Sequence, residues 1–302
     1  GADIVCLQEY AVGIPSNFLT NQKIANALKM YRYRSIIPIG TSGTLKFNIA
    51  VFSKYPISKS RKIKYDSSFN GSSIHELDIR GKKLTLINNH LESFKLTMED
   101  RSHYSAFIKN LNSETLDGLR SSIEQKLGPA FRIRARQARA VAEEIKKIDT
   151  DYVLVCGDFN DTPISYAHRT IQGPLKDAYA ASGCGVGVTY NENFFWFRID
   201  NILHSANMKP INCTVDKVRY SDHYPLWCYL QLKEGIENEK FPYTETVVSR
   251  IGEFLAVLME LALYATVPHR SLHPGCRQTG SRRRRNVALQ KQLRVFDQGN
   301  RI

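Results

Sequence analysis

Residues 151–161 read Asp-Tyr-Val-Leu-Val-Cys-Gly-Asp-Phe-Asn-Asp, an apolar run that ends abruptly in polar side chains. The run predicts a strand buried on both faces, and Gly157 leaves space for another group to come close. If the chain stays extended, Asp158 and Asn160 lie on the same side, because side chains alternate along a strand. A carboxylate beside a carboxamide can hold a cation or a water molecule and also donate to a phosphate oxygen. On its own, however, Asp-x-Asn after a strand is equally typical of a turn.

Four further short apolar segments also have polar side chains at one end. In chain order they present Glu9, His90, Asp200, and Asp222 with His223. A single acidic or histidine residue at a strand end is usually a solvated or structural residue. Five strand ends of one design instead predict a shared site, with several strands meeting at one rim.

Helices are predicted before and after the strand of residues 151–161 in the sequence. Residues 131–148 carry an apolar stripe at helical spacing, and Thr162 with Pro163 predicts the N-cap and first residue of a second helix. Four arginines near the start of the first helix form either a solvated face or a surface facing phosphate, since the helix dipole disfavours cations there. They are Arg132, Arg134, Arg136 and Arg139.

Composition places the chain among ordinary globular proteins, with 302 residues, 42% of them hydrophobic and 24% charged. The formal net charge of +13 suits a polyanionic substrate or surface but does not identify one. The six cysteines form no C-x-x-C pair. They predict buried free thiols, and neither a disulfide framework nor a zinc site is indicated.

The chain divides into two parts of different texture. Residues 1–235 are dominated by short apolar strands, which predicts an α+β sandwich of packed sheets. In residues 236–302, the segment 244–267 predicts an amphipathic helix, because charged residues interrupt its apolar side. The remainder, which includes the arginine run 282–285, predicts a flexible basic tail that either contacts nucleic acid or is simply solvated.

The chain opens on a strand pattern directly after Gly1, without an initiating Met. We therefore expect the natural N-terminus to precede this residue. The sequence contains no recognisable signal peptide and no uncharged run long enough to span a bilayer. The compartment in which the protein works stays unknown at this stage.

The side chains at the five strand ends favour one kind of chemistry. Carboxylates with an amide are typical ligands of a hard cation, Mg²⁺ or Mn²⁺, and no H-E-x-x-H zinc motif occurs. Two histidines with carboxylate neighbours suit proton transfer and the stabilisation of negative charge at phosphorus. The aromatic run 194–197 can stack on bases, enter lipid or pack in the core.

Six short segments together resemble the endonuclease/exonuclease/phosphatase superfamily, which has the deoxyribonuclease-I-like fold. They are residues 7–9, 49–57, 89–93, 157–160, 198–200 and 221–223. They follow the family's order and extend over residues 1–235. The resemblance implies a four-layered α/β/β/α sandwich of two packed mixed sheets, with the family's first strand missing before Gly1. Residues 89–93 are especially similar to the tyrosyl-DNA phosphodiesterase form of that motif.

The same resemblance implies a role for each site residue. Glu9 would bind Mg²⁺ or Mn²⁺, with Asp222 close to it. Asp158 would orient or deprotonate the attacking water. Asn160 and His90 would donate to a non-bridging phosphate oxygen.

Two further roles concern the orientation of the histidines. The resemblance implies that Asp200 holds the imidazole of His223, which stabilises the transition state or shares the role of base. Glu76 would orient His90.

The implied activity is hydrolysis of a phosphate ester by in-line attack of water. A nucleic acid is the favoured substrate. We expect the protein to be a monomer. A hydrolase of lipid or inositol phosphates that contacts a membrane surface is the first alternative. A non-catalytic binding module on a truncated scaffold, motivated by the missing strand and the basic tail, is the second.

Overall fold

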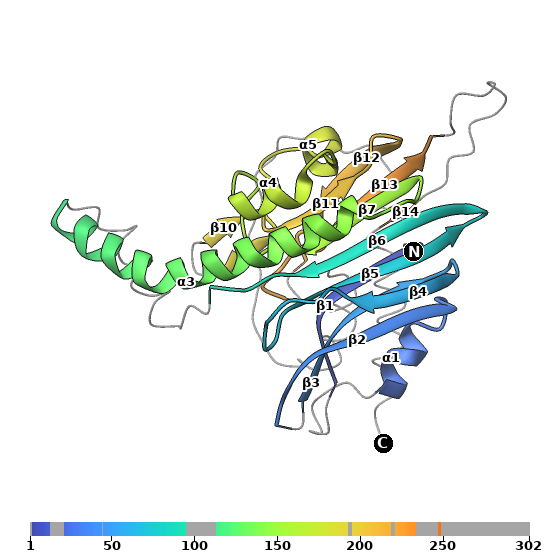
Figure 1. Ribbon diagram of the computed structural model, residues 1–302, viewed down its shortest axis with the longest axis horizontal. Coiled ribbons are helices and arrows are strands. Elements are labelled where there is room, and N and C mark those ends of the chain that lie inside the picture. Colours follow the sequence, from blue (N-terminus) through green and yellow to red (C-terminus); the bar gives the residue numbers. More distant parts are fainter. Residues whose placement is uncertain are drawn as a thin grey trace, which may run out of the picture. The chain divides into compact units, whose positions relative to one another are not determined.

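The computed structural model describes residues 2–12, 21–43, 45–94, 113–192, 195–218, 221–233 and 247–248. All of these belong to one compact unit, Gly1–Tyr264 (Figure 1). The largest sheet has six strands, in the spatial order β4 (Ile57–Lys62), β5 (Gly71–Ile79), β6 (Lys82–His90), β7 (Tyr152–Asp158), β11 (Asp200–His204) and β8 (Lys176–Asp177). Neighbouring strands are antiparallel except β6 and β7, which run parallel and are connected through α3 (Ser113–Lys146).

A second layer of strands consists of two three-stranded antiparallel sheets. One contains β1 (Ile4–Val12), β3 (Leu45–Ser53) and β2 (Tyr33–Ser42), and the other β12 (Met208–Val215), β13 (Leu226–Leu232) and β14 (Val247–Val248). A short hairpin joins β9 (Tyr190–Glu192) to β10 (Phe195–Phe197). The remaining described helices are α1 (Asn21–Ala27), α4 (Tyr166–Gln172) and α5 (Ala178–Ser182).

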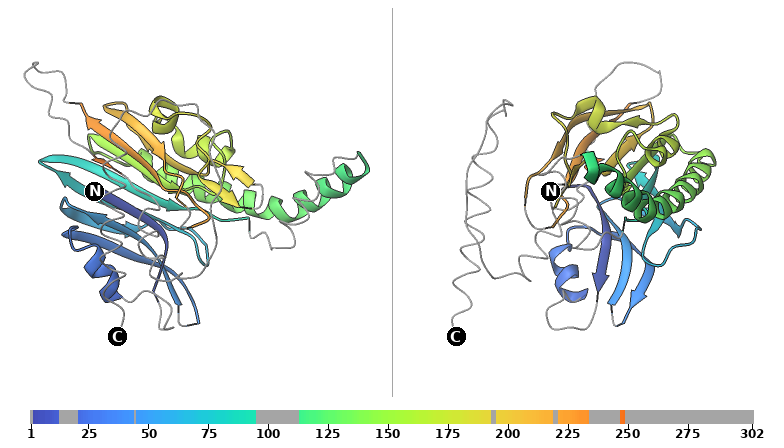
Figure 2. Two further views of the ribbon diagram at one scale, coloured as in Figure 1. Left: turned by 180° about the vertical axis from the view of Figure 1, so that it is seen from behind. Right: turned by 90° about the vertical axis from the view of Figure 1, so that its left-hand side faces the viewer.

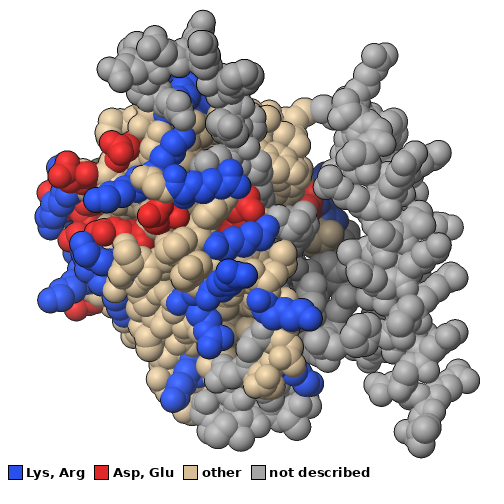
Figure 3. All heavy atoms as spheres, turned by 90° about the vertical axis from the view of Figure 1, so that its right-hand side faces the viewer, with Lys and Arg blue, Asp and Glu red and all other residues tan. Residues whose placement is uncertain are grey.

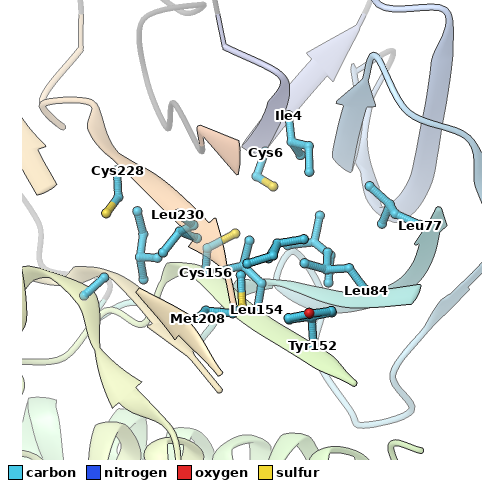
Figure 4. Packing of buried hydrophobic residues seen from close by; sticks show 14 of the residues in the cluster. Ile4, Cys6, Leu77, Leu84, Tyr152, Leu154, Cys156, Met208, Cys228 and Leu230 are labelled. Atoms are coloured by element: carbon cyan, nitrogen blue, oxygen red, sulfur yellow. The ribbon is translucent and has the colours of Figure 1, made fainter. Parts of the chain in front are cut away.

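The main hydrophobic core lies between the six-stranded sheet and the second layer (Figure 4). Leu84, Leu154 and Cys156 extend from the large sheet toward Ile4 and Leu230 of the facing sheets. These side chains are almost completely buried. Each buried aliphatic side chain of this kind stabilises the fold by about 1.5–3 kcal/mol, so this core holds the two layers together.

Helices cover the outer faces of both layers (Figure 2). Ala138 and Val141 of α3 and Ala167 of α4 pack on the outer face of the six-stranded sheet, together with Val155 of β7. Ile24 of α1 packs on the outer face of β1 and β3. The resulting order of layers, α/β/β/α, confirms the predicted α+β sandwich. The large sheet is mixed as predicted, whereas the described strands of the second layer pair only antiparallel.

Two local predictions about helices are corrected. Helix α4 begins three residues after Pro163, and its N-cap is Ser165, whose Oγ accepts a hydrogen bond from the backbone N–H of His168 at 3.1 Å. Thr162 instead begins a turn, because its carbonyl accepts from the N–H of Ser165. In the predicted helix 244–267, Val247–Val248 form β14, since the edge of β13 offers them backbone partners.

Several predictions fall outside the described residues. These are the remainder of the helix 244–267, the basic tail with the arginines 282–285, and Phe194 of the aromatic run. Among the described helices, none combines the length and apolar character needed to cross a bilayer. Five cysteines are described; all are free thiols, and four of them are buried as predicted, whereas Cys184 is exposed.

Candidate active site

Three of the predicted strand ends lie side by side in the large sheet. His90 is the last residue of β6, Asp158 the last of β7 and Asp200 the first of β11. In the strand register, His90 is opposite Asp158 on one side and Asp200 is opposite Asp158 on the other. Asp158 is therefore the centre of the site, between an imidazole and a second carboxylate.

Gly157 makes this close alignment possible. Its φ of +124° lies in a region that other residues rarely adopt. A Cβ atom at this position would lie 2.1 Å from the carbonyl oxygen of Asn89, the residue before His90. The glycine thus allows β6 and β7 to approach at their catalytic ends, as the sequence predicted.

His223 completes the group from a different part of the chain. Its Nδ1 lies 2.8 Å from Asp200 Oδ2, and its Nε2 lies 3.9 Å from Asp158 Oδ2. A backbone bridge and a ring contact with Tyr190 of β9 hold the segment in place. His90 approaches the same Asp158 oxygen from the other side, with its Nε2 at 3.9 Å. Asp158 therefore lies between two imidazoles, one of which is oriented by Asp200.

The charges of these groups are strongly linked. Burial lowers the pKa of His223, but the carboxylates of Asp200, Asp158 and Asp222 outweigh that effect and raise the pKa to about 10. Burial raises the pKa of Asp158; the charge of His223 opposes this shift. Burial also lowers the pKa of His90, which the carboxylate of Glu9 only partly offsets. His223 is thus the protonated imidazole at neutral pH, and His90 is the neutral one.

Asn160 reaches Asp158 by a route that differs from the prediction. The strand ends at Asp158, and Asn160 has a φ of +50°, so the chain does not stay extended. The Asn160 backbone N–H and side-chain amide donate to the two oxygens of Asp158 at 2.7 and 2.9 Å, and the amide also donates to the carbonyl of Leu91. Both amide hydrogens are engaged, so in this structure Asn160 orients Asp158 and has no free donor for phosphate.

Glu9 lies within β1. The sequence pattern instead predicts it at the end of a strand. The strand has an irregularity between Leu7 and Tyr10, where Glu9 adopts a φ of +52°. This bulge turns the side chain toward His90, whose Nε2 lies 3.5 Å from Glu9 Oε1, while 71% of the Glu9 side chain stays exposed. A positive φ at a non-glycine residue is a strained arrangement that is common at functional sites.

Asp222 is exposed and bonds to its neighbour Ser221. The structure brings Glu9 to His90, and the carboxylate of Asp222 helps to raise the pKa of His223. Binding of a cation by Glu9 and Asp222 stays a prediction.

The donor groups of the site fit a divalent cation. One ligand atom each from Asp158, Asp200 and His223 lies within 4.8 Å of the others. Asp200 Oδ1 is buried without a hydrogen-bond partner, so an acceptor is free to bind a cation. The pKa of Asp158 is raised mainly by burial, and the negative charges of Asp200 and Glu9 raise it further. Negative charge therefore accumulates around Asp158, as a cation site requires.

Glu76 does not orient His90, and that prediction is wrong. In the register of β5 and β6, Glu76 is opposite Thr85, whereas His90 is opposite Gly71. Glu76 instead forms an ion pair with Lys59 at the surface. The error arises because the register of β5 against β6 cannot be read from the spacing of motifs along the chain.

Thr189 is a residue of the site that the sequence did not reveal. Its side chain is buried, and its Oγ1 accepts hydrogen bonds from the backbone N–H groups of Ile199 and Asp200 at 3.0 and 3.1 Å. Its carbonyl accepts from the N–H of Tyr224. Thr189 therefore links the start of β11 to the segment that carries His223. It lies in an irregular region where no periodic pattern marks a buried position.

Arg134 differs from the three neighbouring arginines of α3. Arg132, Arg136 and Arg139 are exposed, as both a solvated face and a surface facing phosphate require, but Arg134 is completely buried. A signal was present, since Arg134 continues the apolar stripe of Ala138 and Val141 at helical spacing.

The fold and the site together define a class of protein. Two layers of strands are packed between helices, and at one rim a carboxylate lies between two imidazoles, with donor atoms placed for a divalent cation. This is a hydrolase of phosphate esters with the deoxyribonuclease-I-like fold.

The chain belongs to the Endonuclease/Exonuclease/phosphatase family, whose sequence model matches residues 1–223. Members of this family hydrolyse phosphate esters with the help of a divalent metal, which agrees with the donor set described above. Comparison with curated protein sequences gave no match.

Solved structures with the same fold are distant in sequence. An endonuclease/exonuclease/phosphatase family protein from Leptotrichia buccalis aligns with a TM-score of 0.52 and 14% identity, over 76% of this chain and 87% of that one. The beta toxin of Staphylococcus aureus aligns with a TM-score of 0.50 and 16% identity, over 75% and 86%. An endonuclease/exonuclease/phosphatase from Beutenbergia cavernae has a TM-score of 0.53 and 14% identity, over 76% and 63%. At these identities the likeness concerns the fold alone.

Proposed function

We propose that this protein is a phosphodiesterase that uses Mg²⁺ or Mn²⁺ and water to cleave a nucleic acid. The observation that carries the proposal is the position of Asp158, whose Oδ2 lies 3.9 Å from the Nε2 atoms of both His90 and His223. A carboxylate in this position can accept a proton from water while imidazoles on either side contact the phosphate. The net charge of +13 favours a polyanion as the substrate.

In the proposed reaction, Asp158 takes the proton of the attacking water. The water oxygen forms a bond to phosphorus, and the ester P–O bond on the opposite side breaks. Asp158 must be ionised for this role. Burial raises the pKa of Asp158 to about 8, although the positive charge of His223 opposes that rise, so the ionised form is the minor one at neutral pH and increases as the pH approaches 8. The two hydrogen bonds from Asn160 fix the carboxylate in one orientation.

His223 stabilises the negative charge that develops on the phosphate. Asp200 holds its Nδ1, which leaves the Nε2–H free to donate. His90 is neutral and can donate one hydrogen bond from Nε2 if its proton is on that atom. Pre-oriented donors of this kind stabilise a transition state more than water does, because they need no reorganisation.

We propose Glu9 as the carboxylate ligand of the cation, with Asp222 contributing charge nearby. When bound, the cation supplies positive charge that offsets the charge developing on the phosphate oxygens. The alternative ligand set is Asp158, Asp200 and His223. Mn²⁺ titration by calorimetry distinguishes the two: Glu9→Gln weakens binding much more than Asp200→Asn if Glu9 is the ligand, and the order reverses for the alternative.

The function is tested with single-stranded and double-stranded oligonucleotides and bis-p-nitrophenyl phosphate, each in Mg²⁺ or Mn²⁺. Wild-type protein should cleave at least one of these substrates, and EDTA should abolish the activity. His223→Ala should lower the rate by on the order of 10²–10⁴. Metal-dependent cleavage that is unchanged in His223→Ala would rule out the proposed site.

A hydrolase of lipid phosphates is the second candidate, and one observation favours it. Trp196 and Phe197 of β10 are 60% and 38% exposed, and the adjoining β9 contains Tyr190, which contacts His223. Exposed aromatic side chains beside a catalytic residue can enter a membrane surface or stack on bases.

Hydrolysis of sphingomyelin and phosphoinositides in liposomes separates these possibilities. If the substrate is a lipid, Trp196→Ala reduces activity on liposomes but not on bis-p-nitrophenyl phosphate. If the protein is a binding module without catalysis, nucleic acid binds without metal, and Asp158→Asn binds as well as wild type.

A further inference from the structure

Arg134 of α3 is a fully buried arginine close to the active site. Its Nη1 donates to the carbonyl of Glu92 at 2.7 Å, and its Nε donates to Asp161 Oδ2 at 3.2 Å. The guanidinium also lies over the rings of Phe94 and Phe131, at 4.0 and 4.8 Å from their centres. These contacts fix the guanidinium in one position.

The two partners of Arg134 belong to the two catalytic strand ends. Glu92 follows His90 by two residues, after the end of β6. Asp161 directly follows Asn160, after the end of β7. Arg134 therefore connects the segment that carries His90 to the segment that carries Asp158 and Asn160.

Further hydrogen bonds join the segment after β6 to the segment after β7 and to α3. The place where these three parts meet is called the junction below. Gln137, one turn after Arg134 on α3, accepts from the backbone N–H of Glu92 at 2.8 Å. Between the segments, the N–H of Leu91 donates to the carbonyl of Asp158 at 3.0 Å, and the amide of Asn160 donates to the carbonyl of Leu91 at 2.9 Å. Helix α3 thus holds both backbone groups of Glu92, and Glu92 adjoins the residue that Asn160 binds.

A contribution to the stability of the fold does not explain why an arginine is buried at position 134. The Nη2 atom of Arg134 is buried and has no hydrogen-bond partner, and burial lowers the pKa of the guanidinium. A buried charge with an unpaired donor is destabilising compared with an apolar side chain of similar size. The geometry that Arg134 fixes explains its presence better than a gain in stability does.

We propose that Arg134 is a positioning residue of the active site, which holds the catalytic ends of β6 and β7 at the separation that catalysis needs. The inference rests on the proposed function, because it concerns the same site. Arg134 acts through Glu92 and Asp161, and through them on His90 and Asn160. A displacement of about 1 Å at reacting groups can lower a rate on the order of a hundredfold.

The test compares the initial rates of three single variants over a range of bis-p-nitrophenyl phosphate concentrations in Mn²⁺, which gives kcat and KM separately. Arg134→Met removes the guanidinium, Arg134→Lys keeps the charge without the forked donors, and Arg136→Met is the control at an exposed arginine of the same helix. The proposal predicts that Arg134→Met and Arg134→Lys lower kcat at least about tenfold and change KM less than about threefold. Arg136→Met should keep the wild-type kcat. An unchanged kcat in Arg134→Met would overturn the proposal.

The double variant Arg134→Met/Asp161→Asn separates positioning from stability. Arg134→Met alone leaves the buried carboxyl of Asp161 without its partner and should lower the midpoint of thermal unfolding. The double variant removes both charges, so its midpoint should rise toward that of wild type. Its kcat should stay low, because the carbonyl of Glu92 is still not held. Recovery of kcat together with stability would show a merely structural role and would refute the proposal.

Amide hydrogen exchange provides a readout that is independent of catalysis. If the wild-type protein cleaves no substrate, the proposed function fails, and the effect on the junction is still measured. The double variant should then exchange faster than Arg136→Met at the N–H groups of Leu91 and Asn160, which bond to Asp158. Equal exchange in both variants would contradict the inference.

Discussion

At the scale of single residues, Gly157 is the position in the site that tolerates a side chain least. Replacement by Ala combines a strained φ of +124° with a Cβ atom 2.1 Å from the Asn89 carbonyl oxygen. We predict that Gly157→Ala lowers the free energy of unfolding by more than about 3 kcal/mol, as measured in urea.

Gly81→Ala is the matched control for this substitution. Gly81 also has a positive φ, of +87°, but a Cβ atom there would meet nothing within 4 Å. The control should therefore lose only the backbone contribution, about 1 kcal/mol. Equal losses in the two variants would show that the contact with Asn89 does not limit the approach of β6 and β7.

His75 makes stability depend on pH. It is buried between Ser60 and Ser73, at 2.9 and 2.8 Å, and burial lowers its pKa from the ordinary 6.5 to about 4. Between these values the unfolded chain binds a proton that the folded protein does not. Stability is therefore complete above pH 6.5 and is lost as the pH falls toward 4.

We predict that wild-type protein loses about 2 kcal/mol more stability between pH 7 and pH 4.5 than His75→Asn, which cannot be protonated. Urea unfolding of both proteins at the two pH values measures the difference. The same pH dependence in wild type and variant would mean that folding does not lower the pKa of His75.

At the scale of helices and strands, the N-cap of α4 gives a direct test of the boundary that the structure corrects. Ser165→Ala should lower the free energy of unfolding by about 1 kcal/mol, because the N–H of His168 loses its acceptor. Thr162→Ala, at the N-cap expected from the sequence, should change it by less than about 0.5 kcal/mol. A larger loss from Thr162→Ala than from Ser165→Ala would place the start of the helix at Thr162.

The elements that the sequence predicted well are those with a strong local pattern. β7 is a continuous apolar run, and the ends of β6, β7 and β11 were expected to carry His90, Asp158 and Asp200. Their meeting at one rim follows from the parallel pairing of β6 with β7 and the antiparallel pairing of β7 with β11.

Predictions failed where conformation depends on contacts distant in the chain. The bulge at Glu9 has no local sequence pattern, because glutamate rarely adopts a positive φ. The positive φ of Asn160 has only a weak signal, since Asn adopts this region more often than most other non-glycine residues. The role expected for Glu76 failed because it needed the register of β5 against β6. Arg134 is buried only because Asp161 and the carbonyl of Glu92 are brought to it by two different strands.

At the scale of the whole molecule, the basic charge predicts how a polyanionic substrate binds. On the face shown in Figure 3, most acidic side chains gather in the upper part, and basic side chains extend over the lower part as well. Binding of a single-stranded oligonucleotide to Asp158→Asn, which should leave it uncut, should weaken at least about tenfold between 50 and 200 mM salt.

Fluorescence anisotropy measures this dependence, and an oligonucleotide with an uncharged methylphosphonate backbone is the control. The control should bind weakly at every salt concentration. Affinity for the charged oligonucleotide that does not change with salt would argue against phosphate contacts and in favour of a different substrate.

The central claim is that Asp158, between His90 and His223, acts on the water that attacks a phosphodiester. It is tested most directly by the initial rate of bis-p-nitrophenyl phosphate hydrolysis in Mn²⁺, for wild type, Asp158→Asn and Asp149→Asn. Asp149 is the control, since it is exposed and precedes the other end of β7. The account predicts a rate at least about a hundredfold lower for Asp158→Asn and an unchanged rate for Asp149→Asn. A wild-type rate in Asp158→Asn would contradict it.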